Sequence, residues 1–146
     1  MKNNLADKVK YALKNQNVVA LTTSVSQVSD SAPSSVVGAY IHPDNRIIVD
    51  FTFGQDTDEI YVTPPFKMKV VDITVKCKAT IATGGIIIKK GTTVMQTELA
   101  CAAIGAITRA TNISENVATL DVTDVLNIVG VSSGLEGMVM FDIIQA

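Results

Sequence analysis

The feature that most constrains this fold is a pair of β-rich runs separated by a four-residue loop. Residues 36–41 and 46–53 are rich in β-branched, aliphatic and aromatic side chains, which favour extended strands. The loop between them, His42-Pro43-Asp44-Asn45, combines a proline with two residues that readily form Asx turns. The pattern therefore predicts an antiparallel β-hairpin at the centre of the chain.

Other segments carry strand patterns of their own. Residues 73–83 alternate, so that one face is apolar and the other polar. Residues 18–25, 116–131 and 138–144 are also rich in β-forming side chains. After the hairpin, we expect a polar turn at 54–59 and one helical turn before the next strand, which begins near Lys67.

Two segments predict helices. Between Asn4 and Leu13, apolar residues recur at helical spacing, and Asn4 is a suitable N-cap. Between Met95 and Arg109, the chain is rich in alanine and leucine, and its apolar residues surround most of the predicted helix. Such a helix must be buried on several sides, which favours a subunit interface.

Length and order of elements point to one mainly β domain. A chain of 146 residues supports a single core, so we expect one domain over 1–146. Runs of strands without regular β-α alternation favour an antiparallel barrel or a sandwich. With 5% aromatic residues and no tryptophan, the core must be largely aliphatic. We expect eight side chains to point inward: Val19, Leu21, Val37, Ile47, Val49, Val75, Ala79 and Val122.

Charge and apolar pattern argue against several classes of partner. A net charge of −2 provides no basic surface for nucleic acid. The longest apolar run, 99–107, is too short for a spanning helix, and the start of the chain lacks a signal-peptide pattern. We therefore expect a cytoplasmic protein without membrane contact. Cys77 and Cys101 lack CxxC spacing, which favours buried free thiols over a disulfide or a metal site.

Two short motifs carry little weight. The segment from Gly130 to Gly134 matches the G-x-S-x-G pattern, but a nucleophile elbow needs a histidine later in the chain. The single histidine, His42, precedes it and has no cysteine or second histidine to complete a metal site. We predict no metal site and identify no catalytic residue.

The order of these elements resembles the FMN-binding split β-barrels of the pyridoxamine 5′-phosphate oxidase-like superfamily. The similarity rests on Leu21-Thr22-Thr23, on Pro33, on the segment 53–65 and on 75–84, which ends in glycine. It implies a six-stranded antiparallel split β-barrel of Greek-key type, with an N-terminal helix and one or two further helices.

The same resemblance implies a cofactor and its site. FMN would bind near the second and third strands, with its phosphate beside the turn after the third strand. The residues at the matching positions are Ser35, Val36, Asp50, Phe51, Thr52, Gln55 and Thr57. Asp56 occupies the place of a lysine in this family, and a carboxylate there would repel the phosphate. We therefore expect weak FMN binding, increased by Asp56→Lys.

Two functions follow from the resemblance. One is an FMN-dependent oxidoreductase that acts on a small molecule, with FMN at the interface of a homodimer. The other is a split barrel that has lost FMN and serves as a binding or structural module.

Overall fold

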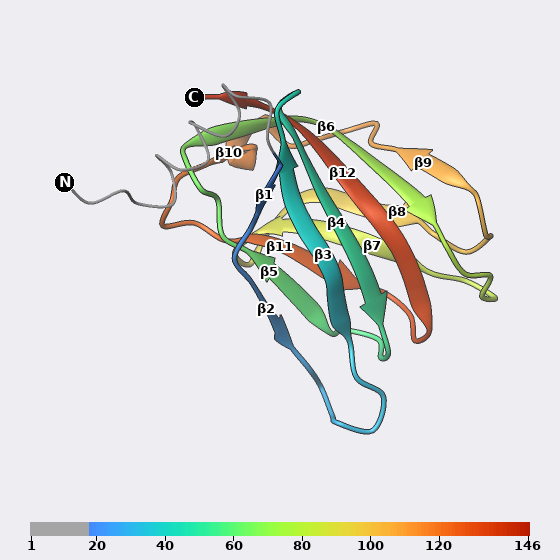
Figure 1. Cartoon of the computed structure of the whole chain (residues 1–146). Coiled ribbons are helices and arrows are strands. Elements are labelled where there is room, and N and C mark those ends of the chain that lie inside the picture. The colour runs from blue at the N-terminus through green and yellow to red at the C-terminus, as the bar shows by residue number, and fades with distance from the viewer. Residues whose placement is uncertain (1–17) are drawn as a thin grey trace.

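The protein is a sandwich of two antiparallel β-sheets (Figure 1). The computed structural model describes residues 18–146, so the helix predicted over 4–13 lies outside the described residues. Within them, the helical element is a 3-10 turn, η1 (Glu115–Val117). No helix among residues 18–146 is long and apolar enough to cross a membrane.

The larger sheet has seven strands and contains the predicted hairpin. Its order is β1-β3-β4-β12-β6-β10, and β9 also pairs with β6. Because the last strand, β12, pairs with both β4 and β6, the end of the chain lies in the middle of this sheet. The strands are β1 (Val19–Ala20), β3 (Ser35–His42), β4 (Arg46–Phe53), β6 (Met68–Cys77), β9 (Ile107–Arg109), β10 (Thr119–Leu120) and β12 (Leu135–Gln145).

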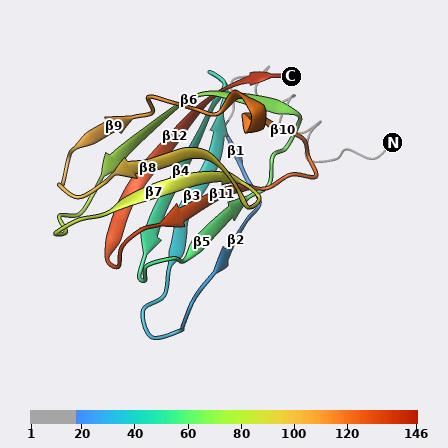
Figure 2. The same cartoon turned by 180° about the vertical axis from the view of Figure 1, so that it is seen from behind.

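The smaller sheet has five strands in the order β2-β5-β11-β7-β8. Figure 2 looks onto this sheet, with the larger sheet behind it. Its strands are β2 (Thr23–Ser26), β5 (Glu59–Val62), β7 (Gly85–Lys90), β8 (Thr93–Ala100) and β11 (Leu126–Gly130).

From β4 onwards, the strands are arranged in the two sheets in the order of a jelly roll. β4, β12, β6 and β9 are neighbours in the larger sheet, and β5, β11, β7 and β8 are neighbours in the smaller one. The two sheets do not close into a barrel. The mainly β, antiparallel prediction is thus confirmed, whereas the six-stranded split barrel is wrong. Alternation along a strand determines which side chains face inward, but not whether a sheet closes on itself.

The predicted hairpin is confirmed. β3 and β4 pair from His42 opposite Arg46 to Ser35 opposite Thr52. In the turn, Asn45 adopts a φ of 62° and its backbone N–H donates to the carbonyl of His42 over 3.2 Å. Asparagine tolerates this left-handed conformation better than most residues, so the local chemistry of the turn fixes the hairpin.

The core between the sheets is aliphatic with a few phenylalanines, as the composition predicts. Of the eight side chains expected inside, Leu21, Ile47, Val49 and Val75 are buried, and Val19 and Ala79 are half-buried. Val37 and Val122 are exposed, so their prediction was wrong. A register shift beside Gly38 turns Val37 outward, and Val122 lies in the loop between β10 and β11.

The helix predicted over 95–109 is also wrong, since β8 and β9 occupy most of that segment. Met95 and Leu99 are buried against the core, while Thr97 and Glu98 face solvent. A strand lets the segment pair with β7 and bury its apolar side, which outweighs the small differences in helix propensity. The helical turn expected over 60–62 is likewise part of strand β5.

Cys77 and Cys101 form a disulfide in the structure, with 5.2 Å between their Cα atoms. The expectation of free thiols is therefore wrong. Cys77 ends β6 in the larger sheet, and Cys101 directly follows β8 in the smaller one. The bond thus links the two sheets at the side of the sandwich where β8 forms an edge.

Candidate functional site

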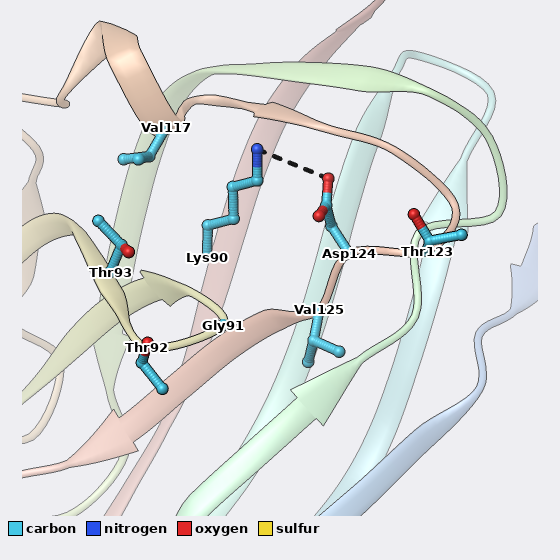
Figure 3. Close-up of a pocket in the computed structure, with 8 residues that line it drawn as sticks. All are labelled: Lys90, Gly91, Thr92, Thr93, Val117, Thr123, Asp124 and Val125. Atoms are coloured by element: carbon cyan, nitrogen blue, oxygen red, sulfur yellow. Dashed lines mark ion pairs between the residues drawn. The ribbon is translucent and has the colours of Figure 1, made fainter.

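A pocket of about 470 Å³ opens at one end of the sandwich. Three separate segments form it: the turn between β7 and β8, the end of η1, and the loop that leads into β11 (Figure 3). Its lining combines hydroxyl, charged and apolar groups. The residues are Lys90, Gly91, Thr92, Thr93, Val117, Thr123, Asp124 and Val125.

Lys90 and Asp124 form an ion pair in this pocket. The Lys90 ammonium lies 3.6 Å from a carboxylate oxygen of Asp124 and also donates to the carbonyl of Thr119 over 3.0 Å. The same oxygen of Asp124 accepts from the backbone N–H of Asp121 over 2.7 Å. Both charged side chains are about 30% exposed, so a ligand in the pocket can reach them while their positions are held by the protein.

The turn on one side of the pocket requires glycine. Gly91 has a φ of +59°, and a Cβ added there would contact nothing. Its N–H donates to the carbonyl of Val125 over 2.9 Å, and its carbonyl accepts from the Asn127 amide over 3.2 Å. These two bonds join the β7–β8 turn to β11 and so fix the distance between the two sides of the pocket.

Asn127 belongs to a polar cluster on the outer face of the smaller sheet. Its amide also donates to Glu59 over 3.0 Å, and the Tyr61 hydroxyl donates to the other Glu59 oxygen over 2.6 Å. Burial alone would raise the pKa of Glu59, but the hydrogen bonds from Tyr61 and Asn127, with the charge of Lys89, lower it overall. The hydrogen bond to Glu59, followed by burial, raises the pKa of Tyr61. The cluster therefore stabilises an ionised Glu59.

The pocket lining carries hydrogen-bond donors and acceptors together with one ion pair. Asp124 is the single carboxylate among the described residues of the lining. The ion pair neutralises both charges, so neither an anion nor a metal cation gains much there. No group of three or more histidine, cysteine, aspartate or glutamate side chains within 18–146 could hold a metal ion.

The residues expected to bind FMN lie at one end of the larger sheet, but their side chains point in different directions. Phe51 is buried in the core, whereas Asp50 forms an ion pair with Lys78 on the outer face. The Gln55 amide donates to the carbonyl of Ala32 over 3.0 Å.

The remaining four expected residues occupy the same end. Ser35 pairs with Thr52, and Val36 with Phe51, between β3 and β4. Thr57 adopts a φ of 69° and its N–H donates to Gly130 over 2.9 Å. In the structure, Ser35, Val36 and Thr52 take part in strand pairing, and Thr57 lies in the turn that follows β4.

Sequence analysis missed the pocket residues. The Lys89-Lys90-Gly91 sequence indicates only the end of a strand, and Asp124 suggests only a local irregularity. A charged residue beside glycine and threonines is common in any exposed turn. The pocket forms because η1 and the β10–β11 loop pack beside the β7–β8 turn. Only information on such long-range contacts could have predicted it.

Comparison with known proteins gives one structural likeness. No family model matches the chain, and no curated protein sequence matches it. Among solved structures, the chain is similar to the family 11 carbohydrate-binding module of the cellulosomal cellulase Lic26A-Cel5E of Clostridium thermocellum. The identity is 10%, the match covers 88% of this chain and 89% of that chain, and the TM-score is 0.34.

These observations correct the proposed resemblance to FMN-binding split barrels. The two sheets are open, the order of strands is that of a jelly roll, and a strand replaces the predicted interface helix. The assignment as an FMN-dependent oxidoreductase is therefore wrong. The FMN site was inferred from the resemblance alone, so it has no further support.

Proposed function

We propose that the protein is a binding module whose end pocket holds a small polyhydroxylated ligand, such as one unit of a carbohydrate. The observation that carries this proposal is the lining, in which the Lys90–Asp124 ion pair stands beside the hydroxyl groups of three threonines. In Figure 3, Thr92 and Thr93 lie on one side of Lys90, and Thr123 and Asp124 on the other.

Each hydroxyl of a sugar both donates and accepts a hydrogen bond, so its site needs donors and acceptors at close spacing. Lys90 supplies donors, Asp124 supplies acceptors, and a threonine hydroxyl supplies either. Val117 and Val125 offer apolar contact for the C–H groups of a ring. A flavin or nucleotide would instead favour an aromatic platform or an uncompensated cation, neither of which occurs among the described lining residues.

We also revise the expected location. The sequence alone favours the cytoplasm, but disulfides persist mainly in oxidising compartments. Because Cys77 and Cys101 are paired and buried, we propose an oxidising compartment. Alkylation of the protein in intact cells, followed by mass spectrometry, tests this point, since two free thiols would contradict it.

The binding proposal can be tested by NMR titration of the full chain with monosaccharides and short oligosaccharides. We expect at least one sugar to shift the amide signals of Thr92, Thr93 and Asp124 at millimolar concentration. Thr93→Val keeps the shape of the side chain but removes one hydrogen bond worth about 1 kcal/mol, so we expect affinity to fall about fivefold.

Thr97→Val is the matched control. Thr97 lies on the same strand, β8, is exposed, and is not among the lining residues. Its substitution leaves the affinity unchanged. If no sugar in the panel shifts the pocket signals, or if both valine variants weaken binding equally, the proposed site is wrong.

A further inference from the structure

The outer face of the seven-stranded sheet carries apolar side chains over most of its width. Figure 1 looks onto this face across β3, β4, β12 and β6. Tyr40 and Ile107 are exposed although they are large and apolar, and isolated domains rarely expose such side chains in a continuous area. The set, called here the outer patch, is Val37, Tyr40, Ile48, Val71, Ile107, Met138, Met140 and Ile144.

A row of directly paired residues crosses the outer patch. Tyr40 on β3 lies opposite Ile48 on β4, Ile48 lies opposite Met140 on β12, and Met140 lies opposite Thr74 on β6. This row is uncharged over these four adjacent strands, and Arg109 on β9 follows Thr74. On β4 and β6, charged side chains lie two residues away on either side of the row, at the next outward-facing positions.

On β4 and on β6, the charges on the two sides of this row are opposite in sign. On β4, Arg46 and Asp50 lie two residues before and after Ile48. On β6, Asp72 and Lys76 lie two residues before and after Thr74. A twofold rotation about the row therefore places Arg46 over Asp50 of a second copy, and Asp72 over Lys76. At these four positions the face is complementary to itself. Asp142 meets the uncharged Met138 of the second copy, and Arg109, which is paired with Asp72 in its own chain, lies at the end of the row.

We infer that the outer patch is the interface of a homodimer in which two seven-stranded sheets pack face to face. The twofold axis runs along the Tyr40–Ile48–Met140–Thr74 row. Such an interface is isologous, because the same surface is used by both copies. A dimer is also expected from the sequence, but there it rests on an apolar helix at 95–109 that the structure replaces with strands.

The size of the face agrees with this interpretation. The four strands that carry this row, β3, β4, β12 and β6, are each at least eight residues long. At a spacing of about 4.8 Å and a rise of about 3.3 Å per residue, they cover roughly 500 Å² of planar area. The relief of the side chains raises the accessible area further, toward the roughly 800 Å² per partner of a standard interface.

The charge pattern distinguishes a second copy from other occupants. Arg46 is paired with Asp142 over 2.8 Å, Arg109 with Asp72 over 2.9 Å, and Lys78 with Asp50. The face therefore has no strong excess of either charge with which to attract an acidic or basic partner. Its alternating charges match those of its own rotated copy.

Sedimentation equilibrium of the full chain tests this inference. We expect about twice the chain mass of 15.5 kDa. Arg46→Glu brings two carboxylates together across the axis, and Asp50→Arg brings two cations together, so each raises the dissociation constant at least about tenfold. The double variant Arg46→Glu/Asp50→Arg restores the opposite charges and the dimer. This rescue separates interface contacts from damage within one chain.

Two further variants complete the test. Tyr40→Glu places a charge on the axis and should also give monomers, while circular dichroism shows that the variant is folded. Glu98→Arg is the control, since Glu98 is exposed on β8 of the other sheet. A monomeric wild type at about 0.1 mM, a mass above that of two copies, or no rescue by the double variant would overturn the inference. None of these results depends on the end pocket.

Discussion

Asp58 is a fully buried carboxylate that holds the long loop between β2 and β3 in place. It accepts hydrogen bonds from the Ser34 hydroxyl and, over 2.7 Å, from the backbone N–H of Val28. The Ser34 hydroxyl in turn accepts from the Gly54 N–H over 3.0 Å. One side chain thus connects the β2–β3 loop with the turn between β4 and β5.

Removal of this carboxylate should destabilise the protein strongly. Asp58→Ala leaves the Ser34 hydroxyl and the Val28 N–H without their acceptor, so we expect a loss of about 3 kcal/mol in the free energy of unfolding. Asp58→Asn keeps one acceptor oxygen and should cost less. Urea denaturation measures both. Asp56→Ala, at an exposed position two residues away, should change stability by less than about 0.5 kcal/mol. Equal effects at positions 56 and 58 would contradict this role.

Glu59 gives the protein a specific response to acid. Because folding lowers the pKa of Glu59 below its ordinary value of 4.5, its stabilising contribution is present above that pH and is lost as pH falls through the folded-state pKa. Glu59→Gln removes this contribution. The stability difference between wild type and Glu59→Gln, measured by urea denaturation, should therefore shrink from pH 7 to pH 3. A difference that stays constant with pH would contradict the assignment.

At the scale of single elements, short-range sequence signals succeed where the turn or the alternation determines the structure. The 42–45 turn predicts the hairpin correctly. The alternating strand predicted over 73–83 is confirmed only as far as Cys77, where β6 ends. The segment 95–109 fails because alanine and leucine favour a helix only weakly, and pairing of β8 with β7 outweighs that preference. A long-range contact decides this element.

The disulfide stabilises the edge of the sandwich at which β8 lies. It joins two residues separated by 24 positions, and closing a loop of that size corresponds to about 3.5 kcal/mol. We therefore expect Cys77→Ala/Cys101→Ala to lower the free energy of unfolding by about this amount. Reductant should have a similar effect on the wild type and none on the double variant. If reductant leaves the wild-type melting temperature unchanged, the bond does not contribute in this way.

At the scale of the whole molecule, the sequence predicts one mainly β, antiparallel domain but leaves barrel and sandwich open. Alternation separates inward from outward side chains, and both architectures satisfy it. The end pocket could not be predicted either, because it too depends on long-range packing. Lys90, Val117 and Asp124 come from three separate segments that lie together only in the folded protein. No local sequence pattern therefore predicts that they share a pocket.

A shared core implies that the two sheets unfold together. Ile47 and Phe141 from the larger sheet belong to the same buried cluster as Ile60 and Ile128 from the smaller one. Separation of the sheets would expose both sets at once, and burial of each such side chain contributes about 1.5–3 kcal/mol. Within the part of the chain that the structure describes, the inner faces of both sheets share this one buried cluster.

Hydrogen exchange of the wild-type protein tests this cooperativity. The slowest amides of β12 and of β11, which are internal strands of different sheets, should exchange with the same free energy, equal to that of global unfolding. Amides of the edge strand β2 should exchange faster, because one side of an edge strand is unpaired. If the β11 amides exchanged several kcal/mol more easily than those of β12, the smaller sheet would open independently. The sandwich would then consist of two cooperative units, and the disulfide between β6 and β8 would be the main connection between them.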